Sequence, residues 1–123
     1  MKKTIFIVTE GETDAEILKK FISDEVEAKI FISEGLSSAL STTRSLLTVT
    51  DQPIILVVDS DTTDSRMVEE RIDFINQYVN AENTDRFKLL IAIPSIEALF
   101  FQDKKLLEKL LGKEISEELV ELG

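Results

Sequence analysis

The chain of 123 residues contains no cysteine and no histidine. Without cysteine it can form neither disulfides nor thiolate metal sites, and without histidine the usual ligands of zinc are missing as well. Any metal ion must therefore be held by oxygen atoms. That condition favours Mg²⁺, Mn²⁺ or Ca²⁺ over softer metals.

Positive charge is scarce, because 14 lysines and arginines face 24 aspartates and glutamates. The resulting net charge of -10 opposes unaided binding to nucleic acid or to an anionic membrane. No segment approaches the ~20 apolar residues that a membrane-spanning helix needs. Thr9, Glu10 and Glu12 also interrupt the N-terminal apolar segment too early for a signal peptide. We therefore expect a cytoplasmic protein without a membrane partner.

The most informative apolar segment is Ile54–Val58, which ends at Asp59 and Asp61. An apolar run without polar alternation is typical of a strand buried on both faces of a parallel sheet, because helices cover each face. In open α/β sheets, ligands bind at the carboxyl ends of the strands. The two aspartates therefore follow the strand at the edge where chemistry usually occurs.

Strands and amphipathic helices alternate along the rest of the chain. Besides Ile54–Val58, the sequence predicts strands at Thr4–Val8, Ala28–Ile32 and Phe87–Ile93. Helices are predicted over about 15–23 and 36–47, and over one or two leucine-rich segments in 103–123. A further helical stripe contains Met67, Val68, Arg71, Ile72, Ile75 and Val79. We expect one α/β domain over 1–123 with its core in about 1–100, in which about four mainly parallel strands lie between helix layers in a Rossmann-like arrangement.

Acidic residues follow three of the expected strands. Glu10 comes after the first strand, and Asp59 and Asp61 come after the third. Glu97 comes shortly after the fourth. Right-handed crossovers place the carboxyl ends of parallel strands on one side, so these acids converge if their strands are neighbours. Like charges ~4 Å apart repel by about 4 kcal/mol at an effective dielectric of 20, and a divalent cation would relieve that repulsion and attract a phosphodiester.

Some of these acids also have an ordinary structural explanation. Turns and helix caps favour aspartate, and we assign Asp64 to such a role. Glu97, near a predicted helix N-terminus, is explained equally well by the helix macrodipole. Glu10 together with Asp59-x-Asp61 is harder to explain by turns alone, and this combination favours a functional site.

Three motifs follow one another in the first two thirds of the chain: Glu10-Gly11-Glu12-Thr13-Asp14 after an apolar strand, the turn Ser33-Glu34-Gly35, and Val57-Val58-Asp59-Ser60-Asp61-Thr62. In order and spacing they resemble the Toprim domain. That domain is the catalytic module of type IA and type II topoisomerases, bacterial primases, small ribosomal-RNA maturases and the overcoming-lysogenization-defect (OLD) nucleases. The segment from Pro94 to Glu97 is similar to a Pro-x-x-Glu element of stand-alone and OLD-like Toprim proteins.

The resemblance implies a Toprim fold whose acidic centre is formed by Glu10, Asp59 and Asp61. In the family, the two aspartates coordinate Mg²⁺, and the glutamate acts in general acid/base chemistry near the metal. The implied activity is phosphodiester hydrolysis on DNA or RNA that depends on Mg²⁺ or Mn²⁺. Glu97 would be a fourth metal ligand.

The chain departs from several branches of this family. Topoisomerases need a nucleophilic tyrosine and large DNA-gating domains, whereas this chain offers only Tyr78. Primases need a zinc-binding domain and a helicase-interacting region, which do not fit here. A small stand-alone protein similar to the OLD-like nuclease branch is the expectation. We expect no ATPase domain like that of this branch, and the sequence does not assign its additional basic residue.

A phosphatase is an alternative function. The segment from Asp59 to Thr63 also fits the Asp-x-Asp-x-Thr loop of haloacid-dehalogenase-type phosphatases, in which Asp59 would be the nucleophile. That loop normally follows the first strand of its domain, and a later acidic pair is not obvious here. The phosphatase hypothesis also leaves Glu10 unexplained.

A non-catalytic module, metal-binding or simply an interaction module that serves as a partner subunit, is the other alternative. The acidic net charge favours it, because the basic residues near expected loops or strand starts are few for a nucleic-acid surface: Lys29, Arg44, Arg66, Arg86 and Lys88. An exposed apolar stripe on the leucine-rich C-terminal segment would further favour a homo-oligomer or a larger protein partner.

Overall fold

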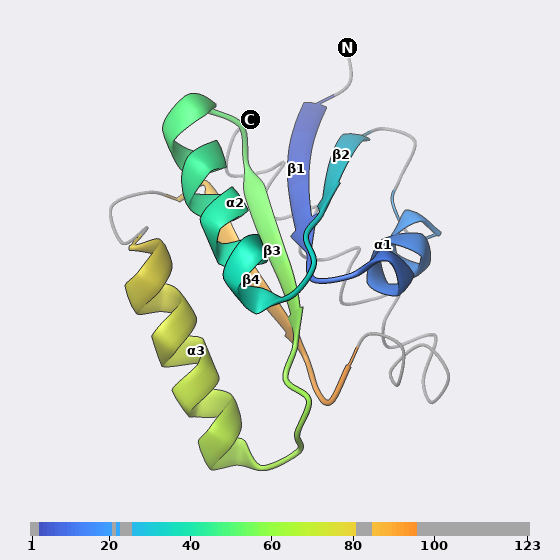
Figure 1. The fold of residues 1–123 in the computed structure, drawn as a ribbon. Helices are drawn as coiled ribbons and strands as arrows, with labels where there is room; N and C mark the ends of the chain where they lie inside the picture. The colour runs from blue at the N-terminus through green and yellow to red at the C-terminus, as the bar shows by residue number, and fades with distance from the viewer. Residues whose placement is uncertain (1–2, 21, 23–25, 81–84, 96–123) are drawn as a thin grey trace.

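The computed structural model describes residues 3–20, 22, 26–80 and 85–95. Within these residues, a parallel four-stranded sheet lies between helices (Figure 1). The elements are β1 (Lys3–Thr9), α1 (Glu12–Lys19), β2 (Val26–Ile32), α2 (Leu36–Val49), β3 (Ile54–Asp59), α3 (Ser65–Val79) and β4 (Phe87–Ala92). This alternation confirms the predicted α/β, Rossmann-like class. No helix in the described ranges is long and apolar enough to cross a membrane.

The strand order is β2-β1-β3-β4. β1 pairs with β2 on one side and with β3 on the other, so that Thr9 lies opposite both Ile32 and Val57. β4 pairs with β3 on its far side, where Ala92 lies opposite Asp59. The chain thus leaves β1 first toward β2 and then returns to the other side to form β3. The boundary between β1 and β3 is therefore the topological switch point, where α/β sheets bind ligands.

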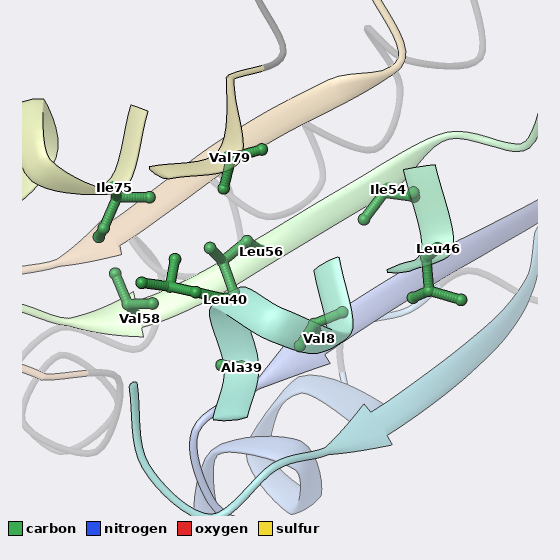
Figure 2. Packing of buried hydrophobic residues seen from close by; sticks show 9 residues of the cluster. All are labelled: Val8, Ala39, Leu40, Leu46, Ile54, Leu56, Val58, Ile75 and Val79. Carbon is green, nitrogen blue, oxygen red and sulfur yellow. The ribbon is translucent and has the colours of Figure 1, made fainter. Parts of the chain in front are cut away.

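β3 is buried along its whole apolar length, and its residues from Ile54 to Val58 are at most 2% exposed. Because successive side chains of a strand point to opposite faces, Ile55 and Val57 pack in the cluster on the α1 side. Leu56 and Val58 pack in the cluster on the α2 and α3 side (Figure 2). The predicted strand covered on both faces is confirmed.

The second face of the sheet is covered by α2 and α3 (Figure 1). Leu40 of α2 and Ile75 of α3 lie over Leu56 and Val58 (Figure 2). α3 begins after Asp64, whose Oδ1 accepts hydrogen bonds from the backbone N–H groups of Arg66 and Met67 at 2.9 and 3.4 Å. The prediction that Asp64 has a structural role is confirmed, because this arrangement is an N-cap.

Several element boundaries differ from the sequence prediction. α1 ends at Lys19 rather than near residue 23, because the backbone N–H of Lys20 bonds to the carbonyl of Ile17 at 3.1 Å and tightens the last turn. α2 extends two residues past the predicted end, and β2 begins two residues before the predicted start. β4 ends at Ala92, one residue early. The predicted C-terminal helices over 103–123 lie outside the described residues.

Arg86 joins the start of β4 to the end of α2. Its guanidinium donates hydrogen bonds to the carbonyl oxygens of Leu47, Thr50 and Gln52 at 3.1, 2.8 and 3.2 Å. Its own carbonyl accepts a bond from the N–H of Ile54 at 2.8 Å. Arg86 was grouped by sequence with the basic residues near loops, and these bonds give it a structural role at a helix C-terminus.

We expect Arg86→Ala to lower the free energy of unfolding by about 2–3 kcal/mol, because three carbonyl groups lose a charged donor. Urea denaturation followed by circular dichroism measures the change. Arg66→Ala, at an exposed position in the first turn of α3, is the matched control and should shift stability by less than about 0.5 kcal/mol. Equal effects of the two substitutions would contradict the structural role.

Candidate functional site

Two of the predicted acidic residues follow the two strands at the switch point. Glu10 comes directly after β1, and Asp59 is the last residue of β3. These strands are hydrogen-bonded neighbours in parallel register, so both residues lie at the same edge of the sheet. The sequence analysis expected these acids to converge if their strands were neighbours. β1 and β3 are neighbours, so that condition is met for Glu10 and Asp59. Both side chains are half-buried.

The loop after β1 is fixed by hydrogen bonds from the loop after β2. The N–H of Ser33 donates to the carbonyl of Thr9 at 2.9 Å, and the N–H of Gly35 donates to the carbonyl of Glu10 at 3.1 Å. Gly35 has a φ of 92°, a conformation that residues with a side chain rarely adopt. The glycine turn of the sequence motif thus holds the backbone of Glu10 in place.

The loop after β3 is fixed by hydrogen bonds to the end of β4 and to the segment that follows it. The N–H of Ser60 donates to the carbonyl of Ala92, and the N–H of Asp61 donates to that of Pro94, both at 2.9 Å. Asp61 has a φ of 59°, a left-handed conformation that aspartate tolerates better than most residues. The turn places Asp61 at the surface, where its side chain is 69% exposed.

Arg71 of α3 reaches this edge and contacts two of the acids. Its Nη2 atom lies 3.3 Å from Oε1 of Glu10 and 3.8 Å from Oδ2 of Asp61. The side chains of Glu10 and Arg71 are only 15% and 25% exposed. One guanidinium therefore links the loop after β1 to the loop after β3.

Arg71 is the site residue that sequence analysis missed. The sequence placed it in the helical stripe of α3, between the residues Val68 and Ile75, which are both buried. A basic residue in an apolar stripe was the available signal, because charged side chains are rarely buried without a partner. Its acidic partners could not be identified from the sequence, because they follow two other elements of the fold.

Burial raises the pKa of the Glu10 carboxyl above its ordinary value of 4.5. The Arg71 guanidinium lowers this pKa through its charge and its hydrogen bond, whereas the negative charges of Asp59 and Asp61 raise it. The net direction is upward. A carboxylate with a raised pKa is a better proton acceptor near neutral pH than an ordinary one.

The donors at this edge have the chemistry that a hard divalent cation requires, because all of them are carboxylate oxygens. Their arrangement differs from a formed metal site, since no three acidic side chains in the described ranges make a group that could hold a metal ion. Instead, the Arg71 guanidinium contacts both Glu10 and Asp61. Glu97, the fourth predicted ligand, lies outside the described residues.

The fold and the site define a parallel α/β protein with an acidic cluster at its topological switch point. Comparisons of the chain with protein-family models, with curated proteins and with solved structures found no match. The resemblance to the Toprim family therefore rests on the motifs themselves.

We expect the Glu10 carboxyl to titrate above 4.5 when its side-chain carbon signal is followed by NMR. Arg71→Gln should raise this pKa further, because a neighbouring positive charge is removed, and Asp59→Asn should lower it, because a negative charge is removed. Arg66→Gln is the control for the loss of one positive charge on α3. A midpoint at or below 4.5 in the unmodified chain would contradict the burial of this group.

The same shift predicts a pH dependence of stability. The folded chain holds the Glu10 proton more tightly than the unfolded chain, so the contribution of Glu10 falls as pH rises from 4.5 through the folded pKa. We expect Glu10→Gln to remove this loss of stability between pH 4.5 and the folded pKa of Glu10. Urea denaturation at a series of pH values measures the free energy of unfolding. If the variant and the unmodified chain show the same dependence on pH, the prediction is wrong.

Proposed function

We propose that this protein is a cytoplasmic Toprim-like nuclease that hydrolyses phosphodiester bonds of DNA or RNA with the help of Mg²⁺ or Mn²⁺. The observation that carries the proposal is the position of Glu10, directly after β1, and of Asp59, at the end of β3, since these strands are neighbours at the switch point. The sequence resemblance selects the same residues. Burial, and after it the negative charges of Asp59 and Asp61, raise the pKa of Glu10, so its ionised form is favoured by a nearby positive charge.

The chain's own residues divide the proposed chemistry among them. A bound divalent ion would supply positive charge that offsets the charge of the phosphodiester. Asp59 and Asp61 would hold that ion, and Glu10 and Glu97 would complete the set of ligands. Glu10 is also the candidate general base, because its raised pKa suits it to accept the proton of the attacking water. The water oxygen bonds to phosphorus as the bond to the leaving oxygen breaks, and the proton passes on to that oxygen.

The presence of Arg71 at this edge is consistent with a substrate that carries phosphate. A guanidinium presents several N–H donors in a geometry that matches phosphate oxygens. Its place beside Glu10 and Asp61 supplies local positive charge in a chain whose net charge is -10. Arg71 is therefore the candidate for the additional basic residue that the sequence could not assign.

We expect Mg²⁺-dependent or Mn²⁺-dependent cleavage of single-stranded or double-stranded DNA or RNA that a chelator abolishes. Glu10→Gln and Asp59→Asn should each slow cleavage by about 100-fold or more, because they remove the proton acceptor and a metal ligand. Glu12→Gln, in the exposed first turn of α1, is the matched control and should stay within about twofold of the unmodified rate. Gel assays of labelled substrates measure the rates.

Calorimetric titration of the same variants with Mg²⁺ and Mn²⁺ separates the alternatives. If Glu10→Gln and Asp59→Asn change neither metal binding nor cleavage, the site assignment is wrong. A phosphoenzyme trapped on Asp59 would instead support the haloacid-dehalogenase-type phosphatase. No binding at millimolar metal, even with a phosphate-bearing ligand present, would favour the non-catalytic interaction module.

A further inference from the structure

A positive charge already occupies the acidic edge of the sheet. The Arg71 guanidinium lies within ion-pair distance of Glu10 at 3.3 Å and of Asp61 at 3.8 Å. These carboxylates belong to the loops after β1 and β3, which the proposed function assigns to a divalent cation. The same oxygen atoms therefore have two possible positive partners, one within the chain and one from solution.

The contacts of Arg71 are incompletely satisfied. Its Nε atom is buried and has no hydrogen-bond partner among the residues that the structure describes. A buried donor without a partner destabilises the arrangement that contains it. The Asp61 side chain is 69% exposed, so water screens its attraction to the guanidinium. The ion pair is thus held mainly by Glu10, and an ion that binds these carboxylates more strongly can replace it.

We propose that Arg71 is the resident counter-ion of this edge and competes with a divalent cation for the oxygen atoms of Glu10 and Asp61. The inference rests on the proposed function for the presence of that cation. It assigns Arg71 a positioning role: the guanidinium holds the two loops together before the cation binds and leaves Glu10 when it does.

Competition makes a prediction opposite to that of a supporting role. If Arg71 competes, its removal leaves Glu10 and Asp61 without their internal partner, so that the cation-free state becomes less favourable and cation binding becomes tighter. If Arg71 merely supports the architecture of the edge, its removal loosens the two loops and weakens cation binding. The sign of the change in affinity therefore decides between the two roles.

The test is calorimetric titration of the full chain with Mn²⁺. We expect Arg71→Gln to lower the dissociation constant about two- to fivefold, as expected for the loss of one partly exposed ion-pair partner. Arg66→Gln removes the same charge from an exposed position of the same helix and should change affinity less than about twofold. Arg71→Lys keeps a positive charge and should bind Mn²⁺ less tightly than Arg71→Gln.

The possible failures are distinguishable. If the unmodified chain binds Mn²⁺ but Arg71→Gln binds it no more tightly than Arg66→Gln, the competition is overturned and the proposed function stands. If no variant binds Mn²⁺ at millimolar concentration, the proposed function and the competition fail together. If Arg71→Gln binds Mn²⁺ and the unmodified chain does not, the competition is supported, because Arg71 then excludes the cation completely.

A second measurement needs no substitution and so does not depend on the folding of a variant. In the unmodified chain, NMR follows the Arg71 Nε–Hε signal during titration with Mg²⁺. We expect this signal to shift and to exchange faster with solvent, with the same midpoint as the backbone amide of Glu10. A Glu10 amide that responds while the Arg71 signal stays unchanged would show that the cation binds without displacing the guanidinium.

Discussion

The burial of β3 on both faces is the constraint on which the rest of the structure depends. Because its residues from Ile54 to Val58 are at most 2% exposed, charged groups can occur only where the strand ends. Parallel pairing with β1 then brings the end of β3 beside the loop that carries Glu10. The core therefore determines where chemistry is possible: at the carboxyl edge, between the two strands of the switch point.

Gathering carboxylates at one edge creates an electrostatic cost that the fold must offset. The raised pKa of Glu10 records that cost, since burial and the charges of Asp59 and Asp61 all disfavour its ionised form. Arg71 opposes it as an internal cation, and a divalent ion could do so more strongly. The proposed competition and the proposed nuclease chemistry both follow from this one balance of charge.

Several basic residues that the sequence placed near loops or strand starts make contacts within the fold. Arg86 bonds to three carbonyls near the end of α2, and Lys29 lies over the ring of Phe6 with Nζ 5.8 Å from its centroid. Arg44 lies 5.3 Å from the centre of the Tyr78 ring, where it makes a cation–π contact. Arg71, which the sequence did not place near the site, contacts Glu10 and Asp61.

Local pattern was enough to predict four strands, three of the helices and the α/β class, because apolar periodicity and turn residues act over a few neighbours. It also selected Glu10 and Asp59, since each directly follows an apolar strand. The sequence alone could not determine strand order, and that order places these residues at one switch point. Nor could it pair Arg71 with Glu10, because that contact joins residues 61 positions apart and exists only once α3 packs across the sheet.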